Sequence, residues 1–197
     1  MIFPETLTGS GPIFETVSRI VNDDFFSMIE VGHINDPEVR KQVAAAIDSS
    51  HARVAFGAQP TILTKKLDLN SFDETKRNEA LTTLMPQIDE AKEIGASRFT
   101  VLSGPDSGEQ KRAQARELLV QSLVELCSYG KKRGINVTLE TFDRTVEKKR
   151  LIGPSDEALA VSKAVKKQFA GFGLMYDMGH APLLDEDPSK SRTSLHF

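Results

Sequence analysis

The sequence predicts an α/β barrel that is incomplete, with about six of the eight strand–helix units of a full barrel. Three observations favour this fold class. Short apolar runs alternate with helix-like segments, as in parallel sheets with crossover helices. No glycine-rich nucleotide-binding signature follows any run. Polar residues end the runs repeatedly, and such decoration around one rim fits a barrel better than an open sheet with a single crevice. These residues are Glu30, Gln59, Ser103, Glu140 and Asp177.

The apolar runs define the predicted strands. In chain order they are Phe25–Val31, Arg53–Gly57, Arg98–Leu102, Asn136–Glu140 and Phe172–Asp177. We expect Met1–Phe3 to be the stub of a further strand that precedes them. Parallel strands of this kind are joined by right-handed crossovers.

Each predicted helix has one apolar face. The first covers Pro12–Val21 and the second Asp36–Ser49, where Asp36 is the expected N-cap and Pro37 takes the first helical position. Ser71 is expected to cap a long third helix.

Glycines mark the ends of the later helices. Gly95 is expected to end the long third helix. The next helix starts near Glu109 and stops near Gly130 or Gly134. The last predicted helix follows Gly153.

The predicted domain is a partial barrel over residues 1–184, followed by a polar tail over residues 185–197. The tail contains Pro188 and has no helical stripe. A full barrel takes about 250 residues, so we expect either a fragment or truncated product, or an open fold. Exposed sheet edges are a liability, which favours the first alternative.

Composition narrows the class of protein. The 197 residues are 39% hydrophobic and 27% charged, which is enough to bury a core. A net charge of -3 argues against a binder of nucleic acid. No apolar run is long enough to span a membrane, and no signal peptide is recognisable. We therefore expect a soluble cytoplasmic protein with no membrane partner, and a buried thiol at Cys127.

The segments Asn136–Arg144 and Phe172–His180 carry the strongest chemical signal. Each is an apolar run that ends in an acid, Glu140 in the first and Asp177 in the second. Carboxylates at the ends of successive parallel strands, with His180 three residues further on, are ligands for a divalent metal. The alternative is that the acids are helix caps or solvated loop residues.

Other polar side chains are weaker candidates for substrate binding. Glu30 and His33 are placed to bind substrate hydroxyls, with a solvated loop histidine as the alternative for His33. Gln59 is a strand-end amide suited to a sugar hydroxyl, although such amides also satisfy loop backbone.

Arg144 is a candidate for an anionic substrate group. Its guanidinium is suited to bidentate binding of a phosphate or carboxylate. The alternative is an ion pair with Asp143 or Glu147. Lys148 and Lys149 belong to a charged stretch that we expect to be solvated.

Two motifs carry a family resemblance. TLETFDR over Thr138–Arg144 and LMYDMGHAPLL over Leu174–Leu184 are supported by Ile29–His33 and Glu90–Phe99. With these motifs the chain resembles the xylose isomerase-like TIM barrels. That is the sugar phosphate isomerase/epimerase superfamily, which also contains enzymes of the AP-endonuclease 2 type. The similarity spans nearly the whole chain, as the first six of eight units.

The resemblance implies a metal site and a catalytic role. Glu140 and Asp177 match the metal-binding Glu and Asp, for Mn, Mg, Co or Zn, and Glu140 is also the implied catalytic residue. His180 matches a residue that contacts substrate in epimerase-like members and metal in endonuclease-like ones. Two further ligands, a His and a Glu from the last two strands, are expected in the family, and the sequence ends before both.

The leading functional hypothesis is a metal-dependent isomerase or epimerase of a sugar or sugar phosphate. The reaction would move a proton through an enediolate, with one carboxylate on each face of the substrate. Glu140 serves one face, and the second carboxylate is the Glu that the sequence lacks. If the chain ends at Phe197, we expect weak metal binding, little activity and self-association through exposed sheet edges.

Two alternatives remain. One is an AP-endonuclease-like, metal-dependent phosphodiesterase, which would need additional histidines after the third and fourth strands. The segments Phe56–Pro60 and Leu102–Asp106 contain none, and the negative net charge disfavours DNA. The other alternative is a non-catalytic fragment that needs a partner.

Overall fold

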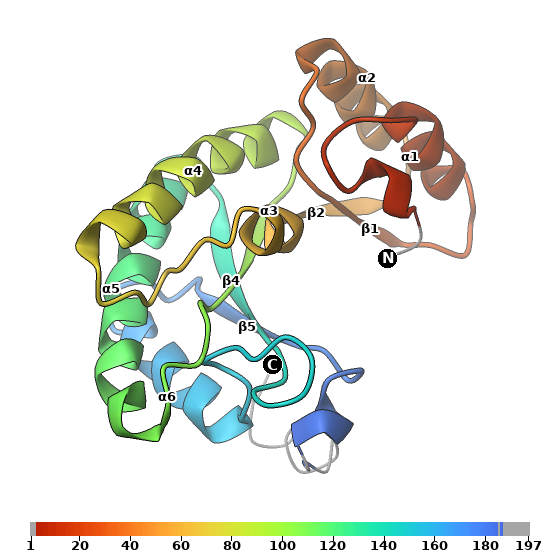
Figure 1. Cartoon of the computed structure of the whole chain (residues 1–197). Helices are drawn as coiled ribbons and strands as arrows, with labels where there is room; N and C mark the ends of the chain where they lie inside the picture. The colour runs from red at the N-terminus through yellow and green to blue at the C-terminus, as the bar shows by residue number, and fades with distance from the viewer. Residues whose placement is uncertain (1–2, 185, 187–197) are drawn as a thin grey trace.

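The structure is a computed structural model that describes residues 3–184 and 186. Within this range the chain alternates strands and helices (Figure 1). The strands are β1 Met28–Val31, β2 Arg53–Gly57, β3 Arg98–Leu102, β4 Asn136–Thr141 and β5 Gly173–Tyr176. The α-helices are α1 Ile13–Val21, α2 Pro37–Asp48, α3 Gln59–Thr64, α4 Glu74–Glu93, α5 Arg112–Lys131 and α6 Ser155–Lys166. The 3-10 helices are η1 Pro4–Thr6, η2 Glu109–Lys111 and η3 Ala181–Leu184.

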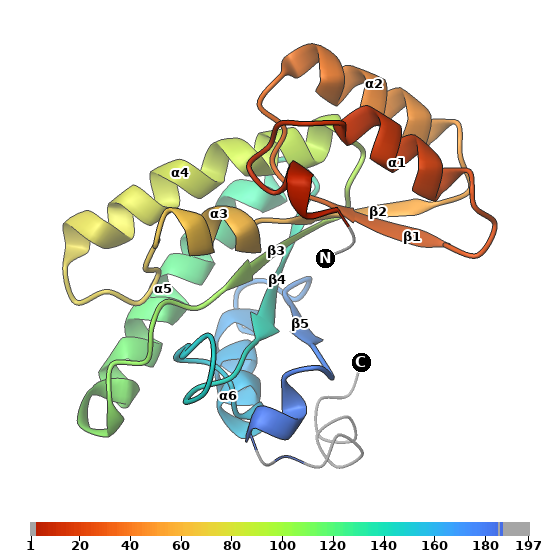
Figure 2. The same cartoon turned by 45° about the vertical axis from the view of Figure 1, so that its right-hand side comes forward.

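The strands form one parallel sheet in chain order, β1-β2-β3-β4-β5. Each strand pairs with the next, and the β3–β4 register places Leu102 beside Glu140. The longer helices lie along the outer side of the curved sheet (Figures 1 and 2). This arrangement is that of a TIM-barrel-like fold, so the predicted fold class is confirmed.

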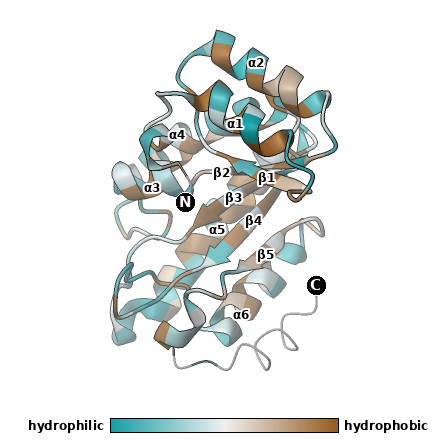
Figure 3. Cartoon of the chain, turned by 90° about the vertical axis from the view of Figure 1, so that its right-hand side faces the viewer, coloured by the Kyte–Doolittle hydropathy of each residue, from teal (hydrophilic) through white to brown (hydrophobic). Residues whose placement is uncertain are grey.

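Burial separates the central strands from the outer ones. In β2, β3 and β4 every residue after the first is buried, which is typical of parallel strands covered on both faces. Phe56 and Phe99, on neighbouring strands, stack with ring centroids 5.4 Å apart. Figure 3 shows hydrophobic residues concentrated on these strands. By contrast, β1 alternates, with Met28 and Glu30 exposed, and β5 is half-buried throughout.

The helix caps were predicted in part. Asp36 caps α2 as expected, because its carboxylate accepts a hydrogen bond from the Glu38 N–H at 2.8 Å. The expected cap of the long helix, Ser71, is wrong. Asp73 caps α4 by accepting from Thr75, whereas the Ser71 hydroxyl accepts from the Asp73 N–H at 3.2 Å, within the preceding turn.

Helix α3 was not predicted. It has six residues, too few to produce a periodic apolar stripe. Pro60 in its first turn was the available start signal. The buried side chain of Gln87 on α4 donates a 2.9 Å hydrogen bond to the Thr61 hydroxyl. This bond fixes α3 and, with it, the position of Gln59 at the helix start.

Four further expectations concern the two chain ends, Cys127 and membrane spans. The expected first strand falls on Met1 and Ile2, which lie outside the described residues, and Phe3 belongs to no strand. The predicted tail, residues 185–197, lies outside the described part except for Glu186. Cys127 is buried on α5, and burial raises the pKa of its thiol to about 12. Among the described helices none is long and apolar enough to cross a membrane.

Candidate active site at the carboxyl ends of the strands

Glu140 lies near the carboxyl end of β4, a central strand of the sheet. The residue is only 6% exposed, and its Oε2 accepts a 2.6 Å hydrogen bond from Nε2 of Gln59. Gln59 begins α3, two residues after β2 ends, so the bond joins two strand ends that β3 separates. A buried carboxylate needs such a donor to be tolerated.

A second carboxylate, Glu30 in β1, lies beside the same amide. Gln59 Nε2 is 3.4 Å from Glu30 Oε1. Gly57 gives the space for this approach, because a Cβ there would lie 2.6 Å from Glu30 Oε1 and 2.7 Å from Gln59 Oε1. We refer to Glu30, Gln59 and Glu140 as the carboxylate–amide cluster.

Burial and like charge act together on the carboxyl groups of this cluster. Burial raises the pKa of Glu140 to about 7; the charges of Glu30 and Asp177 add to the rise, and the Gln59 hydrogen bond opposes it. Burial also raises the pKa of Glu30, again against the effect of Gln59, although the Glu30 side chain is still reached by solvent. A carboxyl group that titrates near neutrality is suited to proton transfer.

Asp177 and His180 form a turn directly after β5. Asp177 Oδ1 accepts a 2.7 Å hydrogen bond from the Gly179 N–H, and its carbonyl oxygen accepts from the His180 N–H at 3.1 Å. The turn brings the imidazole Nε2 within 3.7 Å of Asp177 Oδ2. Glu140 is in register with Met175, two residues before Asp177. Glu140 and Asp177 therefore lie at the same end of the sheet, where the strands reach their carboxyl ends.

One cavity of about 710 Å³ brings these side chains together. Its polar wall is the carboxylate–amide cluster with Asp177 and His180, and α1 and β1 supply an apolar wall. The volume lies in the usual range of about 300–1,000 Å³ for small-molecule sites. In α/β barrels such sites lie at the carboxyl ends of the strands, where this polar wall is found.

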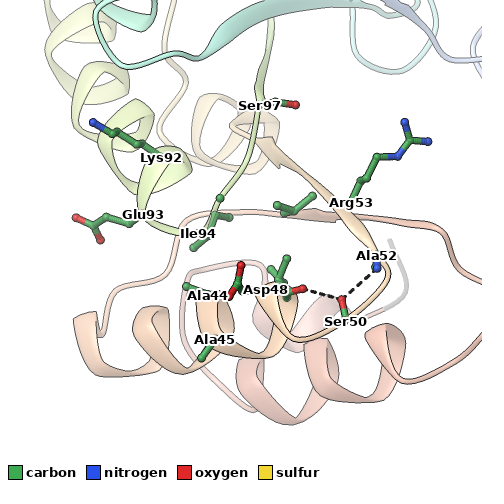
Figure 4. A pocket seen from close by; sticks show the side chains of 13 residues that line it. Ala44, Ala45, Asp48, Ser50, Ala52, Arg53, Lys92, Glu93, Ile94 and Ser97 are labelled. Atoms are coloured by element: carbon green, nitrogen blue, oxygen red, sulfur yellow. Dashed lines mark hydrogen bonds between the residues drawn. The ribbon is translucent and has the colours of Figure 1, made fainter.

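Another cavity, of about 610 Å³, lies at the opposite end of the sheet, beside the amino ends of β2 and β3. Its lining includes Asp48, Arg53 and Lys92 (Figure 4). Arg53 and Lys92 point in different directions in Figure 4, and the Ser50 hydroxyl is used locally to accept from the Ala52 N–H at 3.1 Å. We therefore place the candidate active site in the cavity at the carboxyl ends.

His33, predicted to bind substrate, lines the active-site cavity with both ring nitrogens engaged. Its Nδ1 is 2.8 Å from Glu90 Oε2, and its Nε2 is 2.9 Å from Asn35 Oδ1. The Asn35 side chain is itself held in place, because its Nδ2 donates a 2.9 Å hydrogen bond to the Thr8 carbonyl. His33 thus ties the loop after β1 to α4, and its contact with substrate stays a prediction.

Arg144 binds a protein carboxylate and does not belong to the cavity lining. Its guanidinium donates two hydrogen bonds to Glu157, of 3.0 and 2.8 Å, and a third, of 2.6 Å, to the Leu151 carbonyl. The expected ion-pair partners, Asp143 and Glu147, were wrong, because the structure places the guanidinium on Glu157 of α6. Arg144 therefore links the loop after β4 to α6.

Asp143 organises the loop that follows β4. Its side chain is fully buried, and it accepts hydrogen bonds of 2.7–3.0 Å from the backbone N–H groups of Val146, Glu147 and Lys148. Burial works against ionisation, but these donors outweigh it and lower the pKa of Asp143. The loop brings Lys148 to the cavity, where its ammonium group donates to Glu147 at 2.6 Å.

The surroundings of His180 were missed by the sequence reasoning. Phe142 packs against the imidazole with ring centroids 4.4 Å apart, and Asp143 Oδ1 lies 3.9 Å from His180 Nδ1. Phe142 and Asp143 follow the strand that carries Glu140. Their position just beyond a strand-end acid was the signal that could have identified them.

The donor set suits a divalent cation but is not assembled around one point. Among residues 3–184 and 186, no three His, Cys, Asp or Glu side chains converge closely enough to hold a metal ion. The predicted ligand set of Glu140, Asp177 and His180 therefore does not form a three-membered cluster. Its chemistry still fits, because carboxylates and imidazole bind such ions. A cation would also relieve the repulsion by which Asp177 raises the Glu140 pKa.

Comparison with known proteins identifies the class. Residues 19–194 match the family described as xylose isomerase-like TIM barrel. The chain belongs to this family. No curated protein matches the sequence significantly.

Solved structures share the fold. D-psicose 3-epimerase from Clostridium cellulolyticum H10, solved with D-tagatose, superposes with a TM-score of 0.77 at 14% identity, over 95% of this chain and 65% of that chain. An AP endonuclease of family 2 from Brucella melitensis gives 0.68 at 16% identity, over 92% and 67%. The IOLI protein with a bound zinc atom gives 0.67 at 17%, over 86% and 58%. The chain thus spans 65% of the length of the epimerase that it matches.

Proposed function

We propose that the chain carries the site of a divalent-metal-dependent isomerase or epimerase. It would act on a sugar or sugar phosphate through an enediolate-type proton transfer. The observation that carries the proposal is the carboxylate–amide cluster, which faces one cavity with Asp177 at the carboxyl ends of the strands. Membership of the xylose isomerase-like family and the fold shared with an epimerase support it.

Glu140 and Asp177 would hold the metal, with His180 beside Asp177. Mn, Mg, Co and Zn all accept oxygen and imidazole ligands of this kind. When bound, such an ion polarises the carbonyl and hydroxyl oxygens of a sugar and stabilises the negative charge that develops on them.

Glu140 is the proposed acid–base residue. The Gln59 hydrogen bond holds its Oε2, which leaves Oε1 to take a proton from the carbon beside the sugar carbonyl and to return it. Glu140 alone can exchange that proton with water. Net epimerisation also needs a proton donor on the opposite face of the substrate.

The same cavity offers groups that suit sugar hydroxyls. Gln59 Oε1 is buried and has no hydrogen-bond partner among the described residues, so it can accept from a hydroxyl. Glu30 and His180 line the same wall. Together they would orient a small polyhydroxy substrate against Glu140.

A metal-dependent phosphodiesterase acting on abasic DNA is the second candidate. The fold shared with the AP endonuclease of family 2 favours it. Two observations disfavour it: the segments after β2 and β3, Phe56–Pro60 and Leu102–Asp106, contain no histidine, and the net charge is -3. The third candidate is a non-catalytic fragment that needs a partner.

Two parallel assays separate these candidates. Purified protein with Mn²⁺ is incubated with D-psicose or D-tagatose, and separately with a duplex that contains one abasic site. With the sugar in D₂O, we expect deuterium at the carbon beside the carbonyl, because Glu140 alone can exchange that proton with solvent, and we expect an intact duplex on a gel. Glu140→Gln should abolish the deuterium incorporation, whereas Glu117→Gln, at an exposed position of α5, should not. Cleaved DNA with unchanged sugar would support the phosphodiesterase, and no reaction with either would support the non-catalytic fragment.

A further inference from the structure

The imidazole of His180 is held from one side by the loop after β4. Its Nδ1 is buried and makes no hydrogen bond within the part of the chain that the structure describes. The Phe142 ring packs on the imidazole at 4.4 Å, tilted by 36°. The adjacent residue, Asp143, places Oδ1 at 3.9 Å from Nδ1. This separation is too long for a hydrogen bond, yet it leaves a buried donor or acceptor facing a carboxylate oxygen.

Asp143 has room for that contact. Its Oδ2 accepts from the N–H groups of Val146 and Glu147 and is 3.5 Å from that of Lys149. Within residues 3–184 and 186, its Oδ1 accepts from one donor, the N–H of Lys148, at 2.9 Å. A carboxylate oxygen accepts two hydrogen bonds, so Asp143 Oδ1 can take a second one without losing the first.

The opposite edge of the imidazole meets a different acid. His180 Nε2 lies 3.7 Å from Asp177 Oδ2, beside the cavity that both residues line. The two acids therefore compete for the single proton of a neutral imidazole. Asp143 has no exposure, whereas the Asp177 side chain is 44% exposed, so water can satisfy Asp177 but not the buried Nδ1 edge.

We propose that Asp143 is the positioning residue for His180, with its Oδ1 accepting the Nδ1–H bond, so that Nε2 presents a lone pair to the cavity. A shortening of about 1 Å makes the bond, and hydrogen bonds in active sites often tighten only with ligand present. A carboxylate or carbonyl behind a functional histidine commonly fixes its tautomer in this way. The consequence rests on the proposed function: Nε2 then accepts from a substrate hydroxyl or binds the metal.

The tautomer of His180 can be measured directly. Protein labelled with ¹⁵N in histidine is studied by long-range ¹H–¹⁵N correlation at pH 8 in EDTA, where an unperturbed imidazole is neutral. The His180→Gln variant identifies the His180 signals by their loss. We expect a protonated Nδ1 and an unprotonated Nε2. A protonated Nε2, in either the neutral or the doubly protonated ring, would overturn the proposal.

A variant tests whether Asp143 is the cause. In Asp143→Asn the charge behind Nδ1 is removed, and we expect the His180 proton to move to Nε2, with backbone signals of Val146–Lys149 showing whether the loop persists. An unchanged Nδ1–H tautomer in a folded variant contradicts the proposal. If the variant does not fold, the wild-type measurement decides. Because the readout needs no turnover, a protein with this tautomer but no activity on sugars would refute the proposed function alone.

Discussion

The amide nitrogen of Gln59 donates a 2.6 Å hydrogen bond to the buried carboxylate of Glu140. The two residues come from strand ends on either side of β3, so the contact forms only when the curved sheet is in place. It also defines the chemistry of the cavity, because it stabilises the charged form of Glu140 against burial and the charges of Glu30 and Asp177.

Removing the Gln59 amide should cost more stability when Glu140 is ionised. Hydrogen bonds to charged groups contribute about 1.5–3 kcal/mol and neutral ones about 0.5–1.5 kcal/mol. We expect Gln59→Leu to lower the free energy of unfolding by about 1.5–3 kcal/mol at pH 8, where Glu140 is ionised, and by about 0.5–1.5 kcal/mol at pH 5, where it is neutral. Urea denaturation measures both values. The control is Ser122→Ala, which removes a buried hydrogen bond to the Leu69 carbonyl and should cost the same at both pH values. Equal losses for Gln59→Leu at the two pH values would contradict the assignment.

The raised pKa of Glu140 predicts a pH-dependent stability. In the unfolded chain the group has its ordinary pKa of 4.5, and in the folded protein its pKa is about 7. The folded state therefore holds the proton more tightly, and the free energy of unfolding falls as pH rises from 4.5 through 7. The loss amounts to about 3 kcal/mol.

Glu140→Gln removes this loss. We expect the variant to exceed wild type in free energy of unfolding by about 3 kcal/mol at pH 8 in EDTA, and to gain much less at pH 5. Glu117→Gln is the matched control and should show no such difference. A variant that is less stable than wild type at pH 8 would show that ionised Glu140 stabilises the fold.

A divalent ion should stabilise the folded protein through Glu140 and Asp177. Ligand at about 100 times its Kd adds about 2.7 kcal/mol. We expect millimolar Mn²⁺ to raise the Tm of wild type and of Glu117→Gln at pH 8, and to leave the Tm of Asp177→Asn unchanged. A rise of equal size in Asp177→Asn would place the ion elsewhere.

Arg144 should matter for stability and not for metal binding. Arg144→Met leaves the carboxylate of Glu157 with Arg116 as its ion-pair partner within the described part of the chain, and we expect a loss of about 1–3 kcal/mol in the free energy of unfolding. Lys41→Met, which breaks the exposed pair with Glu38, should cost much less stability, because solvent screens an exposed ion pair. The Mn²⁺-dependent rise in Tm should persist in Arg144→Met. If that rise were lost in the variant, Arg144 would contribute to the metal site.

The strands and their terminal acids were predictable because both signals are local. The strand of Glu140 is recognisable as an apolar run that ends in a carboxylate, and this signal does not depend on how the rest of the chain folds. Helix α3 was not predicted, because six residues are too few to show a helical repeat of apolar residues. The cap of α4 was assigned to Ser71 and not to Asp73, because both residue types cap helices.

The remaining contacts depend on which segments meet in space. Glu157 pairs with Arg144 across a loop and a helix start, and Glu90 reaches His33 from α4. Neither spacing has a sequence signature. The same holds for Asp143, whose backbone donors are local but whose approach to His180 requires β4 and β5 to be neighbours.

Exchange of a sugar proton with solvent tests the central claim most directly. Protein with Mn²⁺ is incubated with D-psicose or D-tagatose in D₂O, and deuterium at the carbon beside the carbonyl is followed by NMR and mass spectrometry. This exchange needs one base only. We predict deuterium incorporation with wild type and with Glu117→Gln. With Glu140→Gln we predict that the rate of incorporation falls by a factor of at least about 100. Incorporation at equal rates in all three proteins, or none with wild type, would contradict the assignment of Glu140 as the acid–base residue.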